Sequence, residues 1–364
     1  MITCGSAVHR LAGVSTSRRL MQLLVVGGSL VFVLTFFVSL GGTSNETKRA
    51  FRMDEREFYF LTNGSNADLR VMSFNIWLSG ASVTDGFQKI LNHILYVNPD
   101  IVCVQELSNG ETFDRMLQGL GSGWSGVFRA GSDYSDDGIF TRHKIHLDDS
   151  FSLTTSVGVK IELEGGRFVH VVGAHLAYQD YGPYAANNRL ATDASQIMAG
   201  ETTPDSYNRV QNIKELVDNE KFQEWVFESD KVALFVCGDF NAPSHHDWTD
   251  ERKHEHGGWT FEWPATQLLE NTTGLIDSFR AKFPNPVTHP AHTWSTVQKF
   301  STGWNYTIPE PQDRLDFVFH KHPQLEVVDA FVYGGNDPLS PIPFHKENTY
   351  PSDHFAMIID FKFK

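Results

Sequence analysis

Residues 231–241, KVALFVCGDFN, carry the pattern that decides the fold. Their Val, Leu and Phe residues form a short apolar run that ends at Gly238, which is typical of a buried strand. Asp239 and Asn241 follow on alternate positions, so their side chains point the same way along an extended chain. An Asx turn after a strand would explain both residues as well. The stretch predicts a buried strand with a polar end.

Polar side chains recur at the ends of other strand-like runs. A polar side chain lies near the end of each of the runs 69–77, 100–107 and 157–176. A polar side chain also lies near the beginning of each of the runs 313–319 and 350–359. Because sites in α/β proteins gather at one edge of the sheet, we expect these side chains to lie together. They are Asn75, Glu106, His175, Asp316, Asp353 and His354.

The chain between these runs alternates between strand-like and helical patterns. Apolar residues recur at helical spacing in 86–100 and 205–228, and 107–123 also reads as a helix. The run 157–176 alternates around Gly165-Gly166, which predicts a hairpin. No internal repeat or long break divides this region. The pattern indicates an α/β fold in one domain, residues 67–364.

The N-terminus has a different composition. Residues 1–19 hold three arginines and no acid, and residues 20–42 are uncharged and mostly apolar. About twenty apolar residues in a helix span a bilayer. Because a cleaved signal normally has only about 7–15 apolar residues, the sequence predicts a transmembrane signal anchor over 20–42.

The positive-inside rule sets the predicted orientation of this anchor. It leaves residues 1–19 as a cytoplasmic leader and everything after Gly42 in the lumen or outside the cell. Residues 43–66 are polar and charged, as expected of a stem or linker. If the N-terminal segment were cleaved instead, the protein would be secreted. Four glycosylation sequons agree with this location, and they begin at Asn45, Asn63, Asn271 and Asn305.

Cysteine content and charge limit the classes of protein further. Three cysteines make no disulfide framework, and the apolar surroundings of Cys103 and Cys237 favour buried free thiols. Residues 67–364 hold 23 Lys and Arg against 40 Asp and Glu, a net charge of −17. A protein that follows long nucleic acid needs basic surface. Nucleic acid is therefore a possible substrate that the charge does not favour.

The collected side chains indicate a type of chemistry. Oxygen ligands suit a hard cation, Mg²⁺ or Mn²⁺, which needs only one or two carboxylates beside the phosphate of a substrate. The loop 242–263 holds four histidines, but their spacing matches no compact zinc motif, so it reads as a surface loop. The set predicts hydrolysis of a phosphoester.

Six ordered motifs resemble the endonuclease/exonuclease/phosphatase superfamily, whose members include pancreatic-type deoxyribonucleases, AP endonucleases and neutral sphingomyelinases. The motifs are SFNIW, VQE, GAHL, GDFN, DRLDF and SDH, and the resemblance covers about residues 69–362. It implies a four-layered α/β sandwich, in which helices flank two mixed sheets that lie face to face. It also implies a metal-dependent phosphoric ester hydrolase.

The resemblance assigns roles to the side chains. It implies that Asn75, Glu106 and Asp353 bind Mg²⁺, with Mn²⁺ possible. Asp239 would orient or deprotonate the attacking water, and Asn241 would hold the scissile phosphate. His354, held by Asp316, and His175 would contact the phosphate from the other side, and Asp136 or Asp137 would support His175.

Neighbouring sequence and charge narrow the substrate. Tyr178 lies in a Tyr-rich loop after His175 and is a candidate substrate contact. The acidic body and the predicted anchor favour a small phosphoester or a phospholipid head group, with DNA or RNA as the alternative. A non-catalytic binding glycoprotein with this fold is a further alternative. The sequence gives no indication of a protein partner.

Overall fold

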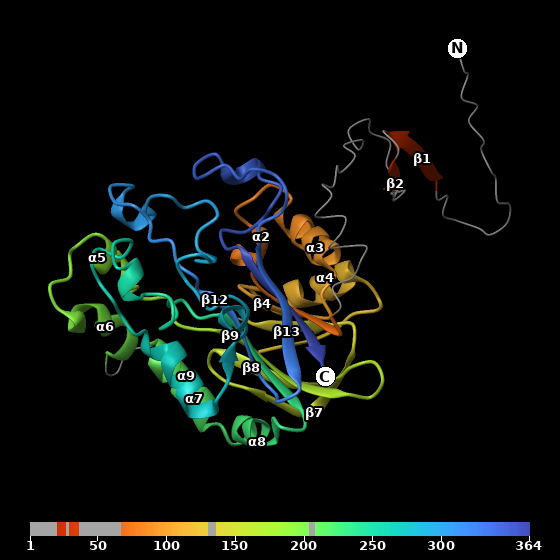
Figure 1. Cartoon of the computed structure of the whole chain (residues 1–364), viewed down its shortest axis with the longest axis horizontal. Coiled ribbons are helices and arrows are strands. Elements are labelled where there is room, and N and C mark those ends of the chain that lie inside the picture. The colour runs from red at the N-terminus through yellow and green to blue at the C-terminus, as the bar shows by residue number, and fades with distance from the viewer. Residues whose placement is uncertain (1–19, 27–28, 36–66, 130–135, 204–207) are drawn as a thin grey trace, which may run out of the picture. The chain divides into compact units, whose positions relative to one another are not determined.

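The computed structural model describes residues 20–26, 29–35, 67–129, 136–203 and 208–364. The chain divides into two units, Met1–Asn63 and Gly64–Lys364. The second unit holds every candidate site residue. Figure 1 labels many of its helices and strands.

The helix predicted over 20–42 is not found where the structure describes that segment. Leu20–Val26 (β1) and Ser29–Thr35 (β2) are antiparallel strands instead. Periodicity cannot separate a continuous apolar run in a helix from one in a strand, and the run contains β-branched residues on both sides of Gly27-Gly28, a dipeptide typical of hairpins. Within the described residues no helix is long and apolar enough to cross a membrane. The predicted luminal or extracellular location of the body stays a prediction.

Two six-stranded mixed sheets form the centre of the second unit. In the first sheet the order is β11 (Ile276–Asp277), β12 (Asp316–Lys321), β10 (Ala233–Asp239), β9 (Phe168–His175), β8 (Ser156–Glu162) and β7 (Lys144–Ser152). In the second it is β13 (Leu325–Tyr333), β14 (Ala356–Phe363), β3 (Leu69–Asn75), β4 (Ile101–Gln105), β6 (Gly138–Thr141) and β5 (Ser125–Phe128). Each sheet has one parallel pair, β9 with β10 and β3 with β4.

The two sheets pack face to face over an apolar core. Side chains of both sheets meet there, among them Val71 and Ile359 from one and Val171 and Phe235 from the other. Cys103 on β4 and Cys237 on β10 belong to the same core, and both are buried free thiols, as predicted. Strands buried on both faces need continuous apolar runs, which explains the composition of the central strands.

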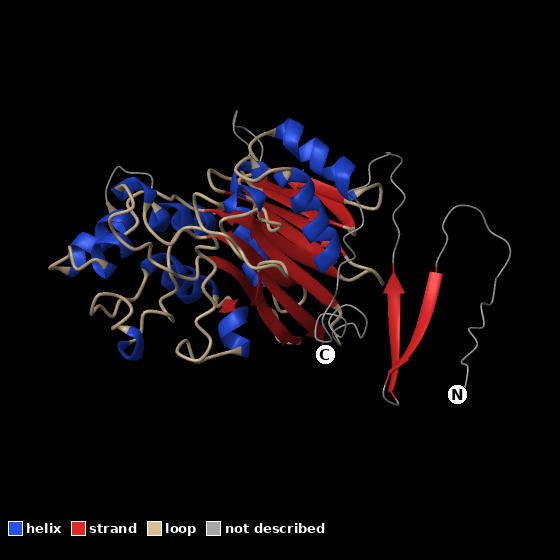
Figure 2. Cartoon of the chain, turned by 90° about the horizontal axis from the view of Figure 1, so that it is seen from above, coloured by secondary structure: helices blue, strands red, loops and turns tan. Residues whose placement is uncertain are grey.

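Helices cover the outer faces of the sheets (Figure 2). α3 (Gly86–Val97) and α4 (Gly110–Leu120) pack on the second sheet, and α7 (Arg209–Asp218), α8 (Glu220–Glu228) and α9 (Pro264–Thr273) pack on the first. The body is thus an α/β sandwich of the implied kind. The shorter helices are α2 (Trp77–Gly80), α5 (Pro183–Asn187), α6 (Ala194–Thr202), α10 (Ser278–Lys282), η1 (Asp250–Arg252), η2 (Thr302–Trp304) and η3 (His345–Glu347).

Two local predictions need correction. The helix predicted over 205–228 is two helices, because Asn219 is extended and its side chain caps α8 by accepting from the Phe222 amide. The segment 242–263 is not a simple surface loop, since Trp248, Arg252 and His256 are buried in it. Helical periodicity cannot show a break of one residue, and a polar composition cannot show which loop side chains pack inward.

Strand register brings the polar ends together. Asp239 at the end of β10 pairs with His175 on β9 and with Asp316 on β12. In the other sheet Asn75 at the end of β3 pairs with Gln105, immediately before Glu106. Since the sheets lie face to face, these ends form one edge of the sandwich.

Candidate active site

Asn75 and Glu106 meet at the ends of β3 and β4. The Asn75 Nδ2 donates to Glu106 Oε1 at 3.2 Å, and the Leu78 amide donates to Glu106 Oε2 at 2.6 Å. Glu106 has a φ of 63°, an uncommon conformation that turns the chain away from the strand direction. The side chain of Glu106 is thereby held beside Asn75.

Asp239 lies between this pair and two histidines. Its Oδ2 accepts from Asn75 Nδ2 at 3.0 Å and lies 3.6 Å from the Nε2 atoms of both His175 and His354. Its Oδ1 accepts from the Asn241 amide at 2.8 Å. Almost the whole side chain is buried. This carboxylate therefore contacts groups from both sheets.

Each histidine is held by its own carboxylate. His175 Nδ1 donates to Asp136 Oδ2 at 2.5 Å, and His354 Nδ1 donates to Asp316 Oδ2 at 2.9 Å. Burial alone would lower the pKa of both imidazoles, but these carboxylates and Asp239 outweigh it. They raise the pKa of His175 well above its usual value and that of His354 to about 10. These carboxylates therefore favour the protonated, cationic form of both rings.

The support of His175 comes from Asp136 and not from Asp137. Asp137 is fully buried and lies 3.3 Å from Arg129 Nε. Burial first, and then the charge of Asp136, raise the pKa of Asp137 well above its usual value. Only one of two adjacent side chains can face His175, because neighbours on an extended chain point to opposite sides.

Asp353 completes the acidic side of the site. It is buried, and its Oδ1 has no hydrogen-bond partner. The pKa of Asp353 is raised to about 8, mainly by burial. The positive charge of His354 opposes this rise, and the charges of Glu106 and Asp239 add to it. Carboxylates whose charges act on one another in this way fit a divalent cation, which would compensate their charge and the unpaired oxygen. The residues present therefore fit a metal ion.

The Asn241 side chain is held by a hydrogen bond, whereas the Tyr178 side chain is exposed. The Asn241 Nδ2 donates to the Leu176 carbonyl at 3.0 Å, and the Asn241 carbonyl accepts from Arg209 Nε at 2.6 Å. The same arginine donates to the Tyr178 carbonyl at 3.2 Å. The Tyr178 ring is 68% exposed, so its predicted contact with a substrate stays a prediction.

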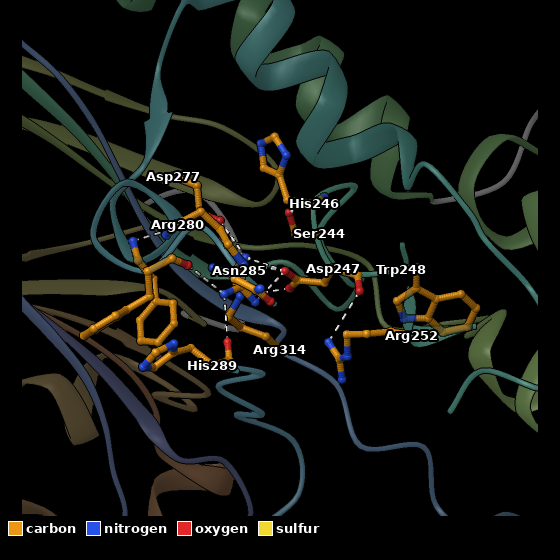
Figure 3. Close-up of polar contacts among 12 residues, drawn as sticks. Ser244, His246, Asp247, Trp248, Arg252, Asp277, Arg280, Asn285, His289 and Arg314 are labelled. Atoms are coloured by element: carbon orange, nitrogen blue, oxygen red, sulfur yellow. Dashed lines mark hydrogen bonds and ion pairs between the residues drawn. The ribbon is translucent and has the colours of Figure 1, made fainter. Parts of the chain in front are cut away.

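A buried ionic cluster that includes Asp247, Asp277, Arg280 and Arg314 was not predicted from the sequence (Figure 3). Arg314 contacts Asp247 at 2.9 Å and Asp277 at 2.6 Å, and Arg280 contacts Asp247 at 2.7 Å. Burial would raise the pKa of Asp247, but Arg314 and Arg280 outweigh it and lower the pKa below its usual value. Arg314 precedes Asp316 by two residues, so the cluster anchors the segment that holds His354.

Aromatic residues support the same segment. The Asp313 carboxylate accepts from Tyr181 Oη and from Trp248 Nε1, each at 2.8 Å. The Trp294 ring packs against the His354 ring at a centroid distance of 4.8 Å. The repeated Tyr, Trp and Asp residues of these loops are a sequence signal for a functional region. Their contact partners lie more than fifty residues away, so the sequence does not show which of them pair.

The eight residues predicted to converge do lie at one edge of the sandwich. Hydrogen bonds and short contacts join Asn75, Glu106, Asp239 and Asn241 on one side to the two His–Asp pairs on the other. Asp353 directly precedes His354 in the chain, and the charge of Glu106 contributes to its raised pKa. Their separate roles stay predictions.

Comparison with known proteins identifies the class. The model of the endonuclease/exonuclease/phosphatase family matches residues 72–354, which is most of the chain. The chain belongs to this family and is a metal-dependent phosphoesterase. The buried cluster of Asp239, Asp316 and His354 could hold a metal ion, which agrees with membership of a metal-dependent family.

Particular relatives differ in how much they share with this chain. An uncharacterised protein of Caenorhabditis elegans is 46% identical over 305 residues, which cover 84% of this chain and 93% of that protein. Nocturnin of Rattus norvegicus is 24% identical over 289 residues, which cover 75% of this chain and 57% of nocturnin. The solved catalytic domain of human nocturnin with bound sulfate has a TM-score of 0.50 at 20% identity, with 81% of this chain and 94% of that chain covered. This likeness shows a shared fold.

Proposed function

We propose that this protein hydrolyses a phosphoester by Mg²⁺-assisted attack of water, as a phosphodiesterase or phosphatase. One observation carries the proposal: the Asp239 carboxylate lies 3.6 Å from two histidines and is joined through Asn75 to Glu106. A carboxylate between a metal site and two cations suits phosphoryl transfer, in which positioning and charge stabilisation supply most of the catalysis.

The side chains would divide this chemistry between them. Glu106, with Asn75 and Asp353, would hold the ion, which supplies positive charge to the phosphate oxygens when it is bound. Asp239 would orient the attacking water and accept its proton. His175 and His354 would contact the phosphate as cations and supply charge or a proton to the leaving oxygen.

A small phosphoester or a phospholipid head group is the proposed substrate class. The net charge of −17 over residues 67–364 supports this choice, because a long polyanion would be repelled by an acidic body. Assays of the purified chain with bis-p-nitrophenyl phosphate, sphingomyelin, inositol phosphates, RNA and duplex DNA test it. Faster turnover of either nucleic acid than of every other substrate would overturn the proposed class.

Removal of the metal is expected to abolish activity. EDTA should stop hydrolysis and added Mg²⁺ should restore it, because the buried acidic groups then lose and regain their counter-ion. In Glu106→Gln one negative ligand is lost, so the Mg²⁺ concentration for half-maximal activity should rise about tenfold or more. The control is Glu111→Gln, an exposed residue of α4. Equal Mg²⁺ dependence of the two variants would exclude Glu106 as a ligand.

Loss of Asp136 is expected to shift the pH profile. Burial lowers the pKa of His175, and the charge of Asp136 raises it. The pKa of this ring should therefore fall in Asp136→Asn. A raised pKa keeps the imidazole charged to higher pH. The alkaline fall in kcat/KM should therefore move to lower pH in the variant, with activity retained on the acidic side. An unchanged alkaline limb would show that the charge of His175 does not matter for turnover.

A further inference from the structure

A second group of possible metal ligands lies outside the active site. His245 and His246, in a turn after β10, both face Glu270 on α9. The Nε2 atoms of the two rings lie 3.3 Å and 2.9 Å from Glu270 Oε2. One ligand atom from each residue lies within 4.8 Å of the others. None of these residues takes part in the chemistry proposed above.

The hydrogen bonds of His245 indicate which nitrogen carries its proton. When the Thr266 hydroxyl donates to the Trp263 carbonyl, 3.3 Å away, it accepts from the His245 amide and from His245 Nδ1. A neutral His245 is then protonated at Nδ1, and its Nε2 lone pair faces a Glu270 oxygen. Two lone pairs at 3.3 Å repel each other unless a cation lies between them.

The Glu270 carboxylate is firmly oriented. Its second oxygen, Oε1, accepts from the Asp277 amide at 3.1 Å. Hydrogen bonds of this kind orient ligands around a metal, as the contact between His245 and Thr266 does for that ring.

Geometry and donor type indicate the ion. In a tetrahedral site with bonds of about 2.0–2.1 Å, neighbouring ligand atoms lie about 3.3 Å apart. The observed 2.9 Å and 3.3 Å are close to this value. Two imidazoles and one carboxylate suit Zn²⁺, unlike the oxygen-rich active site. The His246 side chain is 43% exposed, which leaves solvent access for a water as fourth ligand.

We propose that His245, His246 and Glu270 form a second metal site, for Zn²⁺ or a zinc-like ion. The site would join the turn after β10 to α9. Asp247 follows His246 directly and contacts Arg314. The Asp277 carboxylate also contacts Arg314, and the Asp277 amide donates to Glu270. The ion would thus stabilise the cluster of Figure 3 from its outer side.

The other two histidines of this loop do not join the site. The His254 side chain is 74% exposed and lies 3.8 Å from Glu255, while the buried His256 ring stacks on Trp248. This difference makes His254→Ala a matched control, since it removes an imidazole from the same loop without touching the proposed ligands.

Zinc titration of the full chain tests the proposal. The protein is first freed of metal with a chelator and is then titrated with Zn²⁺ by calorimetry in excess Mg²⁺. We expect one Zn²⁺ to bind tightly to the parent, to His254→Ala and to Glu106→Gln. His246→Ala and Glu270→Gln should bind it at least about tenfold more weakly, since even supporting residues contribute about 10–100-fold.

Spectroscopy and folding measurements complete the test. Co²⁺ in place of Zn²⁺ should give tetrahedral absorption bands in the parent that disappear in His246→Ala, and circular dichroism should show that each variant is folded. The proposal is overturned if the parent binds no Zn²⁺ in excess Mg²⁺, which would mean that a protonated His245 faces Glu270. It is also overturned if binding is lost in Glu106→Gln and kept in His246→Ala. Neither result depends on activity, so the proposed hydrolysis is tested separately.

Discussion

Asp239→Asn is expected to lower kcat by about 10²- to 10⁴-fold, the usual contribution of a positioned general base. The change keeps the shape of the side chain but removes the charge that lies 3.6 Å from both His175 and His354. An amide cannot accept a proton from water at neutral pH. Steady-state kinetics with Mg²⁺ and the preferred substrate of the panel measure the effect.

The control for this variant is Asp250→Asn, whose carboxylate is 81% exposed and contacts only Lys253 among the described ion pairs. It should retain the parent kcat. Circular dichroism and thermal unfolding of Asp239→Asn should match the parent, which would separate a chemical loss from a folding defect. A folded Asp239→Asn protein with the parent kcat would show that another group activates the water.

Arg314→Met is expected to lower the free energy of unfolding by about 3–5 kcal/mol, as is usual when one partner of a buried ion pair is removed. Arg314 is fully buried, and without it Asp247 keeps only Arg280 and Asp277 loses its ion pair. Activity should fall as well, because the same segment holds Asp316 against His354. Urea unfolding and kcat on one preparation measure both effects.

The matched control for this change is Arg115→Met on α4. Arg115 is exposed and lies over the Phe87 ring, so its loss should change stability by about 0.5 kcal/mol or less. If Arg314→Met unfolds at the same urea concentration as the control, the cluster does not stabilise the site as inferred.

Much of the site could be predicted because its signals are local. A run such as 231–241 shows an apolar strand and its polar end within eleven residues, and the DRLDF and SDH segments do the same. Side chains at the ends of neighbouring strands meet whenever the strands pair in register, as Asp239 does with His175 and Asp316. Local pattern and the resemblance together were therefore enough to name the converging residues.

Other features could not be predicted because their partners are distant in the sequence. Asp136 and Asp137 have the same chemistry, and only the turn of the chain places Asp136 against His175. The sequence does not show that Arg314 is buried, because its partners Asp247 and Asp277 lie 67 and 37 residues before it. The two histidines near Glu270 match no zinc spacing, since the third ligand comes from another element.

The α/β class, the order of strands with polar ends, the family and a hydrolytic metal chemistry could be inferred from the residues alone. Each follows from residues that are neighbours along the chain or stand in a recognisable order. The folded chain was needed to show which carboxylate supports each histidine, which charges are buried in pairs, and that residues 20–26 and 29–35 are strands. Those outcomes depend on packing and register between distant segments, and a one-dimensional pattern does not contain them.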